Sequence, residues 1–161
     1  LLTIIIPRHI ERTKTIINEM ESLNLKVHTH SSKNKIDKKT DIYLVDSYGK
    51  TKSFFKVCKT VFLGGSIITH GGQNPLEAAR YGCKILHGPN IWNFKEIYDL
   101  LNKYKVSNKT NNLNQIVNNV DKIFKNKTDY KNIKYKIEKI GKKILNLTVK
   151  EINFYINKNE I

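Results

Sequence analysis

The stretch His70-Gly71-Gly72-Gln73-Asn74-Pro75-Leu76-Glu77-Ala78-Ala79 decides how this 161-residue chain is organised. Asparagine is a preferred N-cap and proline suits the first helical position, so Asn74-Pro75 predicts a helix start. Glu77 then falls at the third helical position, as in a capping box. Glycines before a helix let the backbone approach a ligand, and the free amides of a first turn can bind phosphate. The stretch fits a phosphate site, but by itself it fits a simple helix cap better, because helix caps are common and phosphate sites are not.

A second glycine turn lies just upstream. The apolar residues Val61-Phe62-Leu63 predict a strand, and Gly64-Gly65-Ser66 follows it directly. Strands and helices alternate through most of the chain, which predicts a Rossmann-like α/β fold with a mostly parallel sheet flanked by helices. Strands are expected at residues 3–6, 25–30, 41–46, 61–63 and 84–86, with an extended piece at 106, and helices to about 23, through 54–57, and at 75–81, 93–104, 113–123 and from 130 onward.

Residues that directly follow strands are the candidate site, because ligands of such sheets bind outside the carboxyl ends of the strands. Arg8 has the bidentate donors that suit phosphate, but a surface pairing with Glu11 or Glu77 would also explain it. His9 could bind phosphate, act as an acid, or hydrogen-bond backbone at the strand end. The candidate residues are Pro7, Arg8, His9, Gly64, Gly65, Ser66, Gly71, Gly72, Asn74 and Glu77.

The composition limits the possible partners. A net charge of +15, carried almost entirely by lysine, predicts attraction to polyanions such as nucleic acid or an anionic membrane face. Aromatic residues do not alternate with arginine, so nucleic acid is not expected as a partner. No apolar run approaches the roughly 18 residues of a membrane span.

Cys58 and Cys83 lack the spacing of metal ligands, so no metal site is expected. No nucleophile stands beside a histidine, so no catalytic residue is expected either.

Several motifs, taken in order, resemble those of the 3-deoxy-D-manno-octulosonic acid (Kdo) transferases, which move Kdo from CMP-Kdo onto a lipid A precursor. The resemblance runs from about Thr3 to Tyr98. The motifs are Pro7-Arg8-His9-x-Glu11-Arg12, Asp46-Ser47-x-Gly49, Gly64-Gly65-Ser66, Gly71-Gly72-x-Asn74-Pro75-Leu76-Glu77, Gly88-Pro89 and Asn93-Phe94.

The resemblance implies the C-terminal half of a GT-B glycosyltransferase. Residues 1–129 would form the donor-binding domain, and residues 130–161 a helix that packs on it and toward an N-terminal domain. Arg8 is expected to hold the CMP phosphate, together with the Gly64–Ser66 turn and the helix start at Asn74, and Glu77 is expected near the ribose. The family's general base is a glutamate of the N-terminal domain, so this stretch should bind nucleotide without catalysing transfer.

The family also implies an inverting enzyme with no metal or other cofactor, acting in lipopolysaccharide synthesis at the cytoplasmic face of the bacterial inner membrane. Two residues depart from its pattern: Lys50 replaces an acidic residue, and Gln73 replaces a histidine. Two other functions remain open, a GT-B enzyme that uses a UDP-sugar and a basic, non-catalytic module that binds polyanions.

Overall fold

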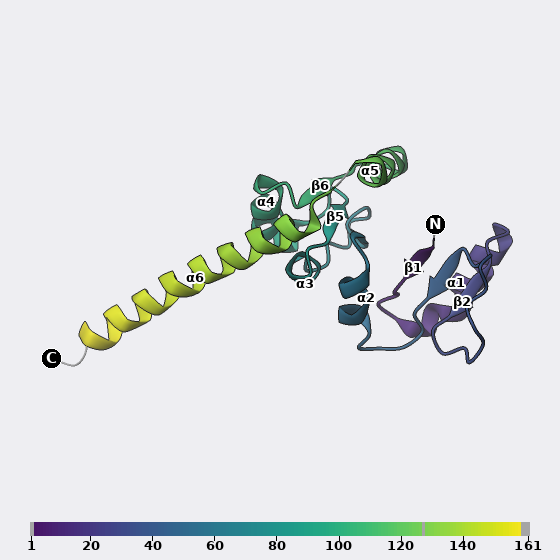
Figure 1. Cartoon of the computed structure of the whole chain (residues 1–161), viewed down its shortest axis with the longest axis horizontal. Helices are drawn as coiled ribbons and strands as arrows, with labels where there is room; N and C mark the ends of the chain where they lie inside the picture. The colour runs from purple at the N-terminus through teal and green to yellow at the C-terminus, as the bar shows by residue number, and fades with distance from the viewer. Residues whose placement is uncertain (1, 127, 159–161) are drawn as a thin grey trace. The chain divides into compact units, whose positions relative to one another are not determined.

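The computed structural model describes residues 2–126 and 128–158, and the chain divides into two compact units, Leu1–Phe54 and Phe55–Ile161 (Figure 1). Each unit contains a three-stranded parallel sheet with helices beside it. The predicted α/β class with parallel strands is therefore confirmed, with the strands distributed over two sheets. The predicted boundary at residue 129 remains a prediction.

In the first unit the strand order is β1-β3-β2, so the last strand in sequence is central. Ile5, Leu44 and Thr29 lie side by side in this register. The side chains of Ile42, Leu44 and Val45 form the buried part of the unit, as expected for a central strand. Its elements are β1 (Thr3–Ile5), η1 (Ile10–Arg12), α1 (Thr13–Ser22), β2 (Val27–Thr29) and β3 (Ile42–Leu44), and α2 (Thr51–Val57) crosses the boundary between the units.

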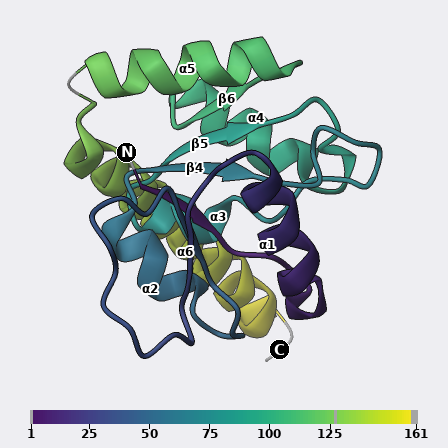
Figure 2. The same ribbon diagram turned by 90° about the vertical axis from the view of Figure 1, so that its right-hand side faces the viewer.

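The second unit has the strand order β4-β5-β6, again all parallel. In both views α5 lies on the other side of the strands from α3 (Figures 1 and 2). Ala78 and Ala79 are fully buried, and their small side chains let α3 pack closely against its neighbours. The elements are β4 (Thr60–Leu63), α3 (Leu76–Arg80), β5 (Lys84–His87), η2 (Trp92–Phe94), α4 (Lys95–Lys103), β6 (Ser107–Lys109), α5 (Leu113–Lys125) and α6 (Tyr130–Lys158).

The long helix α6 changes character along its length. Ile133 and Ile137 are buried in the core of the second unit, and Ile140 packs against that core. Every described residue from Gly141 onward is exposed, and Figure 1 shows this part extending away from the rest of the unit. The helix predicted from residue 130 onward is confirmed, but only its first part is packed against the unit. Among the described residues, no helix combines the length and the apolarity that crossing a membrane requires.

Most predicted elements occur, with shifted ends. The strands are shorter than expected; for example, β2 covers only Val27–Thr29 of the predicted 25–30. The first helix, α1, ends at Ser22, one residue before its predicted end, and Leu23 is 63% exposed. The extended piece expected at residue 106 is the strand β6, which begins at Ser107.

Candidate functional site

The Gly64-Gly65-Ser66 turn follows β4 directly, as predicted. Gly65 has a φ of +80°, and a Cβ atom there would lie 2.6 Å from the carbonyl oxygen of Gly71, so only glycine fits. Ser66 is fully buried. Its hydroxyl donates to the carbonyl of Leu63 at 2.7 Å and accepts from the N–H of Gly88 at 2.7 Å. The two glycine turns thus lie close together at Gly65 and Gly71, and the Ser66 hydroxyl fastens the first turn to the end of β5.

The second turn, at Gly71 and Gly72, is buried against the segment that follows β5. Gly71 has a φ of +93°, in the region that favours glycine. A Cβ atom on Gly72 would lie 3.2 Å from the Ile91 side chain. The carboxamide of Asn93 bonds both backbone groups of Gly72: Gly72 N–H donates to Oδ1 at 3.0 Å, and Nδ2 donates to the Gly72 carbonyl at 2.8 Å.

The helix start at Asn74 and Pro75 is only partly as predicted. Asn74 Oδ1 accepts a hydrogen bond from Leu76 N–H at 3.0 Å, so asparagine satisfies one amide of the first turn. The capping box is wrong in its second half: among the hydrogen bonds of the described residues, none joins Glu77 to Asn74, and the Glu77 side chain is exposed. Glu77 is therefore available to an external partner. The helix itself is short, at five residues, and it begins at Leu76 with Pro75 as its N-cap. The predicted start, with Asn74 as N-cap and Glu77 at the third helical position, is therefore wrong by one residue.

Several backbone N–H groups around the turns have no acceptor among the hydrogen bonds of the described residues. They belong to Gly65, Gln73 and Asn74, and also to Ser66, whose full burial keeps its N–H from an external ligand. Successive loop amides without internal partners can bind anions. The two turns, residues 64–66 and 71–74, approach each other closely at Gly65 and Gly71 and together form a backbone cradle.

Behind the cradle lies a buried pair of aromatic rings. The ring centroids of His87 and Tyr98 are 4.3 Å apart. The Tyr98 hydroxyl donates to the carbonyl of Gln73 at 2.8 Å. His87 Nδ1 donates to the carbonyl of Gly88 at 2.7 Å. Burial lowers the pKa of His87, partly opposed by that hydrogen bond, and burial raises the pKa of the Tyr98 hydroxyl. The histidine is therefore kept neutral and the tyrosine protonated.

In the first unit, Arg8 and His9 follow β1 and are exposed, and Pro7 is half-buried. None of the ion pairs formed by the described residues includes Arg8, and the carboxylate of Glu11 instead accepts from the Tyr48 hydroxyl at 3.1 Å. The surface pairing of Arg8 with Glu11 is therefore not formed. His9 precedes η1 without a side-chain cap, and its carbonyl accepts from Arg12 N–H at 3.2 Å.

Asp46, at the end of β3, binds a neighbouring loop. Its carboxylate accepts hydrogen bonds from the backbone N–H of Ser31 at 2.9 Å and from the Ser31 hydroxyl. Burial tends to raise the pKa of Asp46, but the hydrogen bonds from Ser31 outweigh it, so the pKa lies below its usual value. Asp46 thus joins two strand ends of this unit, a role that its position as a strand-end acid did not reveal.

Sequence reasoning missed three residues of the cradle's support. Asn93 was expected to start a helix, but it lies in η2 with no capping hydrogen bond and grips Gly72 instead. Tyr98 was assigned no role, and Ser66 was expected only as part of the phosphate-binding turn. The partners of these side chains are 21 to 25 residues away in sequence, so local pattern carried no signal for them. Among the described residues, no three His, Cys, Asp or Glu side chains gather as a metal site requires.

The chain was compared with known proteins. No family model matches it. It is 42% identical over 88 residues to the 3-deoxy-D-manno-octulosonic acid transferase of Rickettsia felis, covering 55% of this chain and 19% of that protein. It is 30% identical over 101 residues to the enzyme of the same name from Haemophilus influenzae, covering 63% of this chain and 24% of that protein. The chain thus spans about a quarter or less of the length of these relatives.

The fold also matches a solved structure, the crystal structure of the C-terminal CMP-Kdo binding domain of WaaA from Acinetobacter baumannii. The TM-score is 0.79 at 26% identity, over 87% of this chain and 73% of that one. The sequence matches and the structural match point to the same protein family, which the ordered motifs predicted. In sequence the chain is therefore similar to part of the Kdo transferases, and in fold it is similar to the C-terminal CMP-Kdo binding domain of WaaA.

Proposed function

We propose that the protein transfers Kdo from CMP-Kdo to a lipid A precursor in lipopolysaccharide synthesis, and that this chain supplies the CMP-Kdo site. The observation that carries the proposal is the match, over 87% of the chain, to a domain described as binding CMP-Kdo. The cradle adds physical support, because its unpaired loop amides suit a phosphate group.

The reaction requires a hydroxyl of the acceptor to attack the anomeric carbon of Kdo. The bond from that carbon to the phosphate oxygen breaks, and CMP leaves with the electron pair. Attack from the face opposite the phosphate inverts the configuration. Positive groups and aligned amides that stabilise the leaving phosphate would lower the barrier without a metal ion. A glutamate of an N-terminal domain would take the proton from the acceptor hydroxyl.

Arg8 is the residue of this chain proposed to pair with the CMP phosphate. Its guanidinium is exposed and takes part in none of the ion pairs of the described residues, so no internal partner competes with a ligand. A planar guanidinium can bind two phosphate oxygens at once. Glu77, also exposed, is proposed to accept from a ribose hydroxyl. Pro7 and His9 flank Arg8 and would shape the same part of the donor site.

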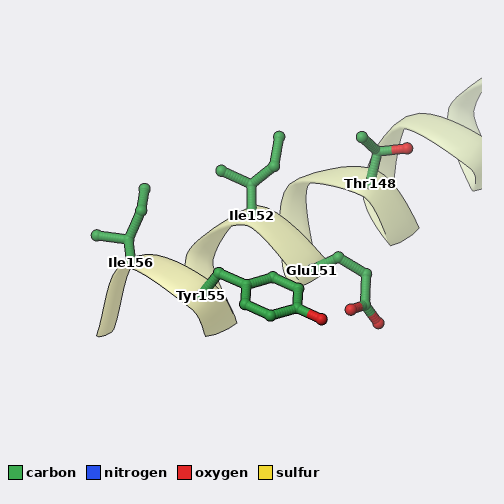
Figure 3. A pocket seen from close by; sticks show the side chains of 5 residues that line it. All are labelled: Thr148, Glu151, Ile152, Tyr155 and Ile156. Carbon is green, nitrogen blue, oxygen red and sulfur yellow. The ribbon is translucent and has the colours of Figure 1, made fainter. Parts of the chain in front are cut away.

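The second half of α6 is proposed to pack against the N-terminal domain. Its side chains Ile152, Tyr155 and Ile156 are between 51% and 59% exposed, and together with Thr148 and Glu151 they line an open groove of about 430 Å³ (Figure 3). The groove lies on one helix, away from the cradle. The match covers only 24% and 19% of the two relatives, so a full-length protein of their size has enough additional residues to cover this face.

Ile152→Glu in the full-length enzyme tests this role of α6. We expect transfer to fall while the affinity for CMP stays unchanged, because a carboxylate disrupts an apolar interface but lies away from the cradle. Asn146→Glu is the matched control, an exposed polar position of the same helix that receives the same charge. Equal transfer by both variants would contradict the proposed packing.

Association with the cytoplasmic face of the inner membrane is the proposed setting. The acceptor is a lipid, and a net charge of +15 favours an anionic surface. The contact proposed for this chain is a peripheral one. Co-sedimentation with vesicles that contain anionic lipid, compared with neutral vesicles, tests this point. Equal binding to both kinds of vesicle would contradict it.

The donor proposal is tested by titrating CMP and UDP into the full-length protein in a calorimeter. We expect CMP to bind more tightly than UDP, and Arg8→Ala to weaken CMP binding by about ten- to a hundredfold, since hydrogen bonds to charged groups are strong. Arg80→Ala is the control, because Arg80 is an exposed arginine in the last turn of α3. Tighter binding of UDP would favour a UDP-sugar enzyme. Polyanion binding that CMP does not compete with would favour a non-catalytic module.

A further inference from the structure

The carboxamide of Asn93 is bound at both ends to one residue of the cradle. Gly72 N–H donates to Oδ1 at 3.0 Å, and Nδ2 donates to the Gly72 carbonyl at 2.8 Å. One donor and one acceptor on a short planar group match the donor and acceptor of a single residue's backbone. Aspartate lacks the donor, and alanine lacks both groups. The interaction is therefore specific to the asparagine carboxamide.

The burial of the two partners differs, and the difference bears on the role of Asn93. Gly72 is buried, whereas Asn93 is exposed. An exposed side chain contributes little to a hydrophobic core, so its removal leaves no internal cavity. What its removal does change is the restraint on Gly72. The geometry thus separates Asn93 from residues whose role is to hold the fold together.

The neighbouring residues restrain the same loop from the same side. Gly71 is close enough that a Cβ atom would lie 3.1 Å from Asn93 Oδ1, and a Cβ atom on Gly72 would lie 3.2 Å from the Ile91 side chain. The next residue, Gln73, is held through its carbonyl by the Tyr98 hydroxyl. The loop therefore rests on η2 and α4, and its conformation is fixed before any ligand arrives.

This arrangement matters for the N–H groups of the loop. Those of Gln73 and Asn74 are used by no hydrogen bond among the described residues, and they directly follow the peptide that Asn93 fixes. Donors held in place before binding cost no reorganisation when an anion arrives, whereas a mobile loop must first lose conformational entropy. A side chain that holds the loop raises affinity for the anion without touching it.

We propose that Asn93 is a positioning residue of the donor site, which fixes the Gly72 peptide so that the loop amides are ready for the phosphate of CMP-Kdo. The inference rests on the proposed function and extends it to a residue behind the cradle. It assigns the binding of phosphate to the loop backbone and the stiffness of that backbone to one exposed carboxamide.

The first test compares Asn93→Ala with Asn90→Ala in the full-length protein. Asn90 belongs to the same segment, but its Nδ2 donates to the carbonyl of Ile67 and does not contact Gly72. We expect Asn93→Ala to raise the Kd for CMP and the KM for the donor about tenfold, with the KM for the acceptor unchanged, and Asn90→Ala to change all three by less than about twofold. Equal Kd values for the two variants would overturn the inference. If the wild-type protein binds no CMP, the proposed function itself fails.

A second variant gives a pH signature that a merely structural role does not produce. Asn93→Asp keeps the acceptor for Gly72 N–H but places a carboxylate oxygen against the Gly72 carbonyl. At pH 7.5 we expect CMP binding weaker than in the alanine variant. As the pH falls toward 4.5 the introduced carboxyl group takes up a proton and can donate to that carbonyl.

The affinity of the aspartate variant, expressed relative to wild type at each pH, should then rise above that of the alanine variant. Loss of the negative charge alone would bring it only to the alanine value, because the donor to the Gly72 carbonyl would still be missing. A ratio that stays at or below the alanine value throughout the titration would overturn the positioning role. The melting temperature of each variant, measured alongside, shows that folded protein was titrated.

Discussion

The hydroxyl of Tyr98 donates a hydrogen bond to the carbonyl of Gln73 at 2.8 Å, and this bond joins the core of the second unit to the cradle. Tyr98 is 1% exposed, and its ring centroid lies 4.3 Å from that of His87. The bond therefore acts on the cradle from behind, from a residue that a ligand cannot reach. Because burial raises the pKa of this tyrosine, its hydroxyl remains a donor throughout the physiological pH range.

Tyr98→Phe tests this connection while keeping the aromatic packing. We expect a loss of about 1 kcal/mol in the free energy of unfolding and a three- to tenfold rise in the Kd for CMP, because the Gln73 carbonyl loses its restraint. Chemical denaturation and calorimetry measure the two effects. Tyr104→Phe is the control, since its hydroxyl appears in none of the hydrogen bonds of the described residues. An unchanged Kd would mean that the hydrogen bond from Tyr98 does not affect the binding of CMP at the cradle.

Gly64 and Gly65 form a matched pair of substitutions. A Cβ atom on Gly65 would lie 2.6 Å from the carbonyl oxygen of Gly71, at a φ of +80°, whereas one on Gly64 would meet nothing within 4 Å. We expect Gly65→Ala to abolish measurable CMP binding and to cost about 1–3 kcal/mol of stability through backbone strain. Gly64→Ala should cost less than about 1 kcal/mol. Similar losses in the two variants would contradict the close approach of the two turns.

The positions of the two glycine turns could be predicted from the sequence, because the features that set them are local. Gly65 follows an apolar strand, and Asn74-Pro75 precedes an alanine-rich helix. Because ligands of parallel sheets bind outside the carboxyl ends of the strands, residues that directly follow strands were the candidates. The supports of the cradle could not be predicted, because they depend on which distant segment packs against it. Asn93 bonds Gly72, which is 21 residues away in sequence, whereas the residues next to Asn93 predicted only a helix start.

The capping box shows a second limit of local reasoning. The spacing of Asn74 and Glu77 satisfied the motif, and Asn74 does bond an amide of the first turn. Glu77 remains exposed, since the reach of a long side chain is decided by rotamer choice and by solvation rather than by spacing. A carboxylate left free in this way suits the ribose contact proposed above. The sequence pattern alone did not distinguish the two roles.

Ser66→Ala removes a buried hydroxyl that serves two backbone groups. The Leu63 carbonyl loses a donor, and the Gly88 N–H is left without an acceptor in a fully buried position. We expect a loss of about 2 kcal/mol in the free energy of unfolding, which urea denaturation would measure. Ser53→Ala, at an exposed position of α2, serves as the control and should change stability by less than about 0.5 kcal/mol. A loss in Ser66→Ala no larger than in the control would mean that the hydroxyl does not fasten the turn.

His87 predicts a specific dependence of stability on pH. Burial lowers its pKa in the folded protein, opposed in part by the hydrogen bond to Gly88, while the unfolded chain returns it to about 6.5. Between the two pKa values the unfolded state binds more protons, so the free energy of unfolding falls as the pH drops below about 6.5, by at most about 1.4 kcal/mol per pH unit. Above that pH the contribution is complete.

Urea denaturation at pH 7.5 and pH 5.5 measures this loss. In His87→Gln the protein should be less stable at both values, because the contact with Tyr98 is lost, but the difference between them should shrink. His70→Gln removes an exposed histidine of the turn region and is the control for the loss of one imidazole. If His87→Gln retains the full pH difference, the acid sensitivity belongs to another group and the buried imidazole is not held neutral.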